Sequence, residues 1–292
     1  MSSIAQSVAL SNTNTTTPYL NFEAQGSLVK IAYHDGLYRP TKSTSTRGDV
    51  TEFSRRSRKR LLEKTARIDL ASVTLKNPII FITLTYAKLY PTPEAAKTHL
   101  DTFLKRIKRF APESSGIWRI ELQQRGAPHF HVIFFHLPYL PKETLSRMWG
   151  EIIGQEYWDY THDPRPPFTR IESLKTPRRA FYYVSKYVAK VPDAPSEDSG
   201  FINVPYLTAL SEMGRWWGTF NRKFLPLAEL IALTIPINSQ SVEQVLFQYR
   251  RLMAHKWKFA NRFGRLRGAS LFVDDSEQWF DALLWCVIEY AE

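Results

Sequence analysis

Apolar and polar positions between residues 79 and 135 follow the spacing of β-strands. Residues 79–86 form a continuous apolar and β-branched run after Pro78, which is typical of a central strand. In residues 117–123 apolar and polar side chains alternate, and residues 129–135 form a second apolar run after a turn at 125–128. The two segments therefore predict a β-hairpin.

Helical spacing of apolar residues is clearest after Thr92. That residue can cap a helix with Pro93 at its first position, and the apolar side chains that follow recur every three or four residues. The pattern predicts further helices at residues 52–68, 142–153 and 177–190, and further strands at 28–33 and 168–171.

Composition along the chain predicts three regions. Residues 1–18 are rich in Ser, Thr and Asn and are expected to be a mobile tail. Residues 19–192 are expected to form one domain that includes the helix at 52–68. A Pro-containing linker then leads to residues 193–292, which are expected to be mostly helical and to contribute to DNA binding.

The charge of the chain favours a polyanionic partner. Lys and Arg number 39 against 28 Asp and Glu, a formal net charge of +11, so nucleic acid is the first expectation. Two basic segments are candidates to contact DNA. Their residues are Arg55, Arg56, Arg58, Arg250, Arg251, Lys256 and Lys258.

Other classes of protein are disfavoured. The single cysteine, Cys286, allows no intramolecular disulfide and no Cys-rich zinc site. The sequence lacks the order of a signal peptide and has no apolar run long enough to span a bilayer, so no membrane association is expected.

Two histidines on the predicted hairpin suit metal binding. His129 and His131 stand two residues apart, which places both imidazoles on one face of a strand. Glu121, on the polar face of the partner strand, is the preferred third ligand, and Gln123 is the alternative. Two imidazoles and a carboxylate can hold one divalent ion and leave positions for a substrate oxygen. Taken alone, this spacing is more often structural than functional.

The predicted helix at 177–190 carries two Tyr–Lys pairs. At about 100° per residue, Tyr183, Lys186, Tyr187 and Lys190 share one face of that helix. Tyrosines four residues apart are usually packing residues. The lysines on the same face, however, suit a phosphate, and a polarised phosphate can be attacked by a tyrosine hydroxyl.

Three ordered blocks resemble the motifs of HUH-superfamily rolling-circle replication initiators of bacterial plasmids and single-stranded DNA phages. The blocks are residues 81–86, 126–131 and 183–190, and the resemblance covers about residues 78–192. The tyrosine follows the histidines here, whereas conjugative relaxases have the opposite order. The resemblance implies an α+β fold, with a central antiparallel sheet flanked by helices and a mostly helical C-terminal extension.

The resemblance also implies a reaction. By analogy His129, His131 and Glu121 hold Mg²⁺ or Mn²⁺, and a tyrosine becomes linked to the 5′ phosphate of nicked single-stranded origin DNA. Both Tyr183 and Tyr187 remain candidates for the nucleophile. The origin duplex is a second DNA partner, and the implied location is the cytoplasm of a bacterial host. The sequence contains no GxxxxGK[ST] phosphate loop, so a host helicase is expected as a partner.

Three other functions are compatible with the sequence. A tyrosine transposase of the same superfamily would use the same chemistry on the ends of a mobile element. A non-catalytic DNA-binding replication factor would use only the basic segments and would bind DNA in a salt-sensitive way without cutting it. A metal-dependent hydrolase would cut DNA with water and form no covalent adduct.

Overall fold

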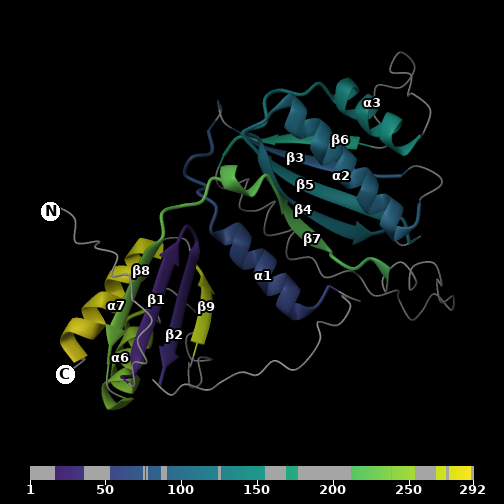
Figure 1. Ribbon diagram of the computed structural model, residues 1–292. Coiled ribbons are helices and arrows are strands. Elements are labelled where there is room, and N and C mark those ends of the chain that lie inside the picture. The colour runs from purple at the N-terminus through teal and green to yellow at the C-terminus, as the bar shows by residue number, and fades with distance from the viewer. Residues whose placement is uncertain are drawn as a thin grey trace. The chain divides into compact units, whose positions relative to one another are not determined.

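The computed structural model divides the chain into two compact units, and each is described by itself (Figure 1). The five-stranded unit comprises residues 47–65 and 69–226, and the four-stranded unit comprises residues 1–46, 66–68 and 227–292. The residues that the structure describes are 17–35, 53–74, 76, 78–86, 91–123, 126–154, 169–176, 212–237, 239–253, 268–273 and 276–290.

The five-stranded unit is built on an antiparallel sheet with the strand order β6-β3-β5-β4-β7. Its central strand β5 lies between β3 and β4, so the predicted hairpin partner and the predicted central strand flank the histidines. The strands are β3 (Ile79–Leu84), β4 (Ser115–Leu122), β5 (Pro128–Phe135), β6 (Thr169–Leu174) and β7 (Trp217–Phe220).

The turn between β4 and β5 fixes the register of the hairpin. Gly126 adopts a φ of 86°, a left-handed conformation that favours glycine. The backbone N–H of Gln123 donates to the carbonyl of Ala127 at 2.9 Å, and that of Gly126 donates to Gln123 at 2.8 Å. This closure sets Glu121 directly opposite His129.

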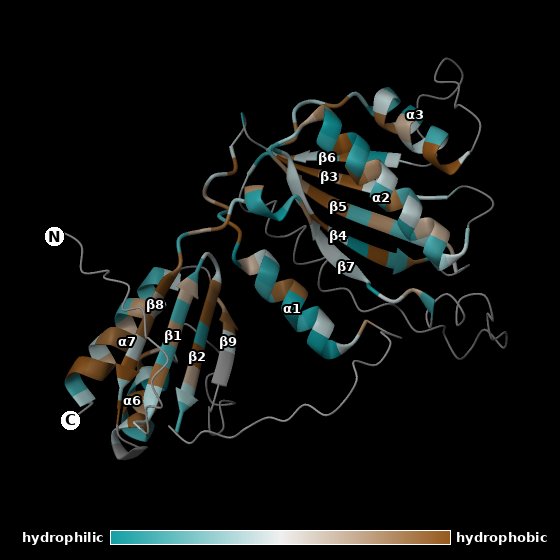
Figure 2. Ribbon diagram, in the orientation of Figure 1, coloured by the Kyte–Doolittle hydropathy of each residue, from teal (hydrophilic) through white to brown (hydrophobic). Residues whose placement is uncertain are grey.

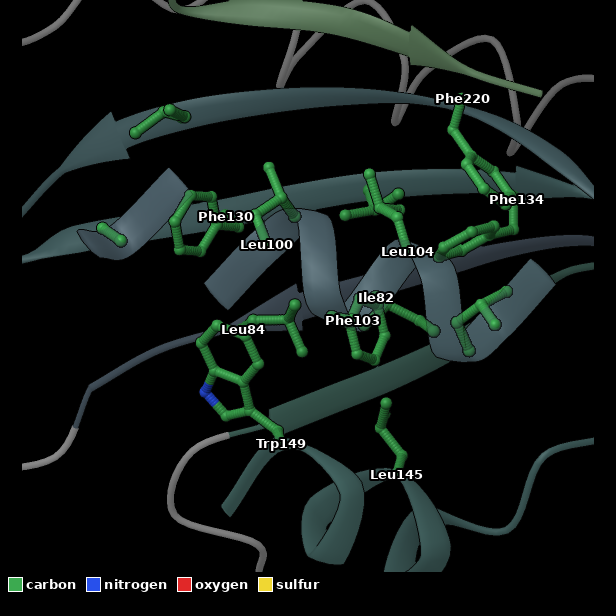
Figure 3. Packing of buried hydrophobic residues seen from close by; sticks show 14 of the residues in the cluster. Ile82, Leu84, Leu100, Phe103, Leu104, Phe130, Phe134, Leu145, Trp149 and Phe220 are labelled. Atoms are coloured by element: carbon green, nitrogen blue, oxygen red, sulfur yellow. The ribbon is translucent and has the colours of Figure 1, made fainter. Parts of the chain in front are cut away.

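Two helices cover one face of this sheet. Helix α2 (Pro93–Phe110) begins after Thr92, whose hydroxyl accepts the backbone N–H of Ala95, as predicted. It packs with α3 (Lys142–Ile153) over the apolar side chains of β3 and β5 (Figure 3). Large buried rings fill this core, and burying each contributes about 1.5–3 kcal/mol. They include Phe103, Phe130, Phe134 and Trp149.

Two shorter elements complete the five-stranded unit. The predicted basic helix is present as α1 (Arg55–Ala66), of which Leu61 and Thr65 are buried. The 3-10 turn η2 (Arg222–Phe224) follows β7, and Ser115 of β4 donates its hydroxyl to the carbonyl of Phe224 at 2.9 Å.

The four-stranded unit is an antiparallel sheet with the order β8-β1-β2-β9 and two helices on one face (Figure 2). Alternate apolar residues of the strands pack with the helices, and the other positions of the strands are mostly polar. The elements are β1 (Tyr19–Gln25), β2 (Leu28–His34), β8 (Ile231–Pro236), α6 (Ser239–Met253), β9 (Gly268–Phe272) and α7 (Ser276–Tyr290).

The division of the chain differs from the predicted single domain over 19–192. Strands β1 and β2 pair with β8 and β9 rather than with the five-stranded sheet, because their apolar residues share a core with α6 and α7. The helices expected in residues 193–292 are confirmed in α6 and α7, and the same region also supplies β7, β8 and β9.

The α+β fold class and the central antiparallel sheet are confirmed. The predicted helix at 177–190 and residues 1–16 of the predicted tail lie outside the described residues. Within the described part of the chain, none of the helices combines the length and the apolar character needed to cross a bilayer.

Candidate functional site

Polar side chains occupy two adjacent rows on the face of the five-stranded sheet that α2 and α3 do not cover. Thr83 and His131 alternate along their strands with Ile82, Leu84 and Phe130, which point into the helix-covered core. One row crosses all five strands. In strand order it consists of Arg170, Thr83, His131, Arg119 and Trp217.

His131 and Glu121 are in direct contact within these rows. The Nε2 atom of His131 lies 3.2 Å from Oε2 of Glu121, and their side chains are only 7% and 13% exposed. The Thr83 hydroxyl lies 3.3 Å from Nδ1 of His131, and the ring of Phe81 stacks on the imidazole. Contacts at both nitrogens and on the ring face hold the His131 imidazole in one orientation.

His129 is held by a separate contact from β3. The hydroxyl of Thr85 lies 2.7 Å from its Nδ1 atom, so Nε2 is the ring atom at which a metal would bind. The buried indole of Trp149 donates to the carbonyl of Thr85 at 2.8 Å, which fixes the end of β3. The ring centres of His129 and His131 are 4.6 Å apart. Thr83 and Thr85 therefore support the histidines, as the sequence predicts.

The donor atoms suit a divalent ion in kind and, for two of them, in spacing. Adjacent ligands at right angles around an ion with bonds of about 2.1 Å are about 3.0 Å apart. The 3.2 Å between His131 and Glu121 is close to that value. Among the described residues, no group of three or more His, Cys, Asp or Glu side chains is arranged as a complete metal site. His129 therefore stands beside the pair rather than in a closed three-ligand cage.

Glu121 is better placed than Gln123 as the carboxylate or amide ligand. Glu121 contacts His131 directly, whereas Gln123 lies beyond the end of β4 and its backbone N–H closes the hairpin turn. The predicted order of preference between these two residues agrees with their positions.

A buried arginine borders the histidines on β4. Arg119 is 3% exposed, lies opposite His131, and carries its guanidinium 5.0 Å from the ring centre of Phe53. Burial lowers the pKa of Arg119, the neighbouring Glu121 raises it, and Arg58 of α1 lowers it. A cation in this position was not predicted, because its neighbours Phe53 and Arg58 are distant in the sequence.

Helix α1 lies beside this row of the sheet. The indole N–H of Trp217, next to Arg119 in the row, donates to the hydroxyl of Ser57 at 3.0 Å. Together with the contact between Phe53 and Arg119, this brings the predicted DNA-binding residue Arg58 close to the candidate site. Arg55 and Arg56 are exposed on the same helix.

The remaining predicted site residues are not part of this cluster. Arg250 and Arg251 lie near the end of α6 in the four-stranded unit, where Arg251 is exposed. The other predicted residues lie outside the part of the chain that the structure describes. These are Tyr183, Lys186, Tyr187, Lys190, Lys256 and Lys258.

Comparison with known protein families gives one match. Residues 79–192, less than half of the chain, match a family of replication-associated proteins of the ORF2 type. The matched segment begins at β3 and contains the whole His129–His131–Glu121 cluster and the predicted tyrosine helix. Neither a curated protein nor a solved structure matches the chain. The family match supports a role for this protein in the initiation of replication.

Proposed function

We propose that this protein nicks and rejoins single-stranded DNA at a replication origin through a 5′-phosphotyrosine intermediate, and so initiates rolling-circle replication as an HUH-type enzyme. The observation that carries the proposal is the contact of His131 with Glu121 beside His129, on an otherwise apolar strand. Polar groups that are buried and mutually oriented in this way are typical of functional sites. The family match across residues 79–192 supports the same direction.

In this proposal His129, His131 and Glu121 would hold Mg²⁺ or Mn²⁺. The bound ion would supply Lewis-acid polarisation of the scissile phosphate. Imidazole donors favour Mn²⁺ over Mg²⁺, whereas the carboxylate suits both. The hydroxyls of Thr83 and Thr85 would fix the two rings through Nδ1, so that Nε2 of each ring faces the ion.

The proposed covalent step exchanges one phosphodiester for another. The phenolic oxygen of Tyr183 or Tyr187 attacks the phosphorus and forms a P–O bond, while the bond from phosphorus to the 3′ oxygen of the preceding nucleotide breaks. The phenolic proton is lost and the leaving 3′ oxygen is protonated, which yields a 3′-hydroxyl that can prime synthesis. Lys186 and Lys190, on the same predicted helix face, would offset the phosphate charge. Attack by a 3′-hydroxyl on the phosphotyrosine reverses the step and reseals the strand.

The proposal is tested by formation of a covalent adduct. The full chain is incubated with labelled single-stranded origin DNA and Mn²⁺ and separated on a denaturing gel. We expect a labelled protein band that disappears in the Tyr183→Phe, Tyr187→Phe double variant. Tyr139→Phe is the matched control, because Tyr139 is 84% exposed and lies away from the cluster, in the loop before α3. This control should form the adduct at the normal level.

Two outcomes would replace the proposal by another function. Cleavage without a protein–DNA band would indicate hydrolysis by water, and salt-sensitive binding without cleavage would indicate a DNA-binding replication factor. An adduct that survives in the double variant would assign the nucleophile to another residue.

The proposal includes partners of the reaction. A separate host helicase would unwind the origin duplex, and the exposed arginines of α1 and α6 would contact the phosphates of that duplex. We expect the purified chain not to unwind duplex DNA with ATP. Strand separation by the chain alone would contradict this part of the proposal.

A further inference from the structure

A buried positive charge lies next to the candidate metal ligands. Arg119 is the cross-strand neighbour of His131 and stands two residues from Glu121 on the same face of β4. Its 3% exposure leaves little water to screen the guanidinium. Arg58, half-buried on α1, adds a second cation close enough to influence Arg119.

The two arginines are held in place from different elements. Phe53, just before α1, lies against the Arg119 guanidinium, and Ser57 accepts the indole N–H of Trp217. The first turn of α1 is thereby fastened at two points beside the sheet. The positive charge is therefore a fixed part of the site rather than a mobile surface side chain.

Fixed cations act in opposite ways on the two ligands of the proposed enzyme. A divalent ion bound by His129, His131 and Glu121 would be repelled by Arg119 and Arg58, so its affinity for the DNA-free site would be reduced. A DNA phosphate would be attracted by the same charges. Once bound, the phosphate brings negative charge to the ion, so DNA and metal each strengthen the binding of the other.

We infer that Arg119 and Arg58 are positioning charges that keep the metal site weak until DNA arrives and that help to draw the DNA phosphate to it. The inference rests on the proposed function. Its consequence is that at limiting metal concentration the site fills mainly in the presence of DNA. Metal-dependent chemistry would then be restricted to the protein–DNA complex.

The test measures metal affinity rather than activity. Binding of Mn²⁺ to the full chain is followed by electron paramagnetic resonance, with and without single-stranded origin DNA, and His129→Ala gives the background. We expect Arg119→Met to bind Mn²⁺ about tenfold more tightly than the unchanged chain in both conditions, because one buried positive charge is removed. Arg58→Met should show a smaller increase. Binding of DNA without metal, measured by fluorescence anisotropy, should weaken severalfold in both variants.

Two control variants separate charge from structure. Arg119→Lys keeps the charge and should restore the original Mn²⁺ affinity to within about twofold. Arg109→Met removes an exposed charge from α2, which packs on the opposite face of the sheet, and should change neither affinity. A loss of structure would lower Mn²⁺ affinity, so tighter binding cannot come from misfolding. If Arg119→Met does not fold, Arg58→Met carries the test.

The inference and the proposed function fail in different ways. If Arg58→Met and every folded Arg119→Met sample bind Mn²⁺ no more tightly than the unchanged chain, the inference is overturned while the metal site stands. If the unchanged chain and His129→Ala bind Mn²⁺ equally, with DNA and without it, the proposed metal site itself is wrong.

Discussion

The two units of the chain share an architecture and differ in their second sheet face. Each has an antiparallel sheet with two helices on one face, α2 and α3 in the five-stranded unit and α6 and α7 in the four-stranded unit. On the other face of the five-stranded sheet, His131, Glu121 and Arg119 are buried or nearly so and lie against one another. The corresponding face of the four-stranded sheet also carries polar residues, but they are more exposed.

The contacts on the second sheet are local pairs. Tyr19 stacks on the exposed ring of His34 with ring centres 4.5 Å apart, and Thr234 donates to the side-chain oxygen of Asn21 at 3.2 Å. Burying polar groups has a cost that solvated pairs avoid. The comparison indicates that the five-stranded unit retains buried polar groups for function, while the polar face of the four-stranded unit is an ordinary solvated surface.

The largest expected effect separates the histidines of the two units. His131→Ala removes a proposed metal ligand and should reduce metal-dependent cleavage by about a thousandfold or more, because Lewis-acid catalysis supplies several kcal/mol to the transition state. His34→Ala removes an imidazole from the other sheet and should leave cleavage unchanged. Rates are measured on the same labelled single strand. Equal loss in both variants would break the functional distinction between the units.

Core substitutions should destabilise each unit by a comparable amount. Trp149→Ala in the five-stranded unit and Phe22→Ala in the four-stranded unit each remove a fully buried ring, at a cost of about 3–5 kcal/mol. Cys286, whose pKa is raised by burial to about 11, is a reporter for the four-stranded unit.

A thiol reagent at neutral pH measures this difference. Phe22→Ala should expose Cys286 to rapid modification, whereas Trp149→Ala should leave it slow, because local unfolding opens the unit that was weakened. Equally fast modification in both variants would indicate that the two units unfold together.

The supporting threonines give a smaller, sharper comparison. Thr85→Val removes the hydroxyl that contacts His129 and should weaken Mn²⁺ binding by about tenfold, as loss of a group that orients a metal ligand does. Thr234→Val removes a hydroxyl from the other sheet and is the matched control. Isothermal titration with Mn²⁺ distinguishes the two. Unchanged affinity in Thr85→Val would show that His129 needs no such support.

The smallest expected effect is a pH dependence of stability in the five-stranded unit. Burial lowers the pKa of His99, whose Nδ1 lies 3.0 Å from the hydroxyl of Tyr86. The fold therefore favours neutral His99, and this stability is present above the unfolded pKa of about 6.5 and is lost as the pH falls through the lower folded value.

Thermal unfolding at pH 7.5 and pH 5 tests this sign. His99→Gln, which cannot titrate, should lose about one or two degrees less than the unchanged chain on acidification. A larger loss in His99→Gln would contradict the assigned direction.

Local patterns predicted the part of the site that lies on neighbouring strands. A hairpin brings residues of nearby sequence together, so the spacing of His129 and His131 and the alternation around Glu121 were enough to place them on one face. The capped start of α2 at Thr92 was predictable for the same reason, because a cap is a contact within one turn.

Long-range pairing could not be predicted in the same way. Strand β1 pairs with β8, which joins Tyr19 to Pro236 across most of the chain. The alternation of Leu20, Phe22 and Ala24 marks β1 as a strand but does not name its partner. The role of Arg119 was missed because Phe53 reaches it from a distant segment. Sequence spacing carries no information on such contacts.

The most direct test of the account is the identity of the residue that becomes linked to DNA. Full-length protein is reacted with single-stranded origin DNA and Mn²⁺, digested with protease and nuclease, and examined by mass spectrometry. The account predicts a nucleotide 5′-phosphate attached to the peptide at Tyr183 or Tyr187, and no such peptide from the His131→Ala variant. Cleaved DNA with an unmodified tyrosine peptide, or an adduct that forms equally well without His131, would contradict it.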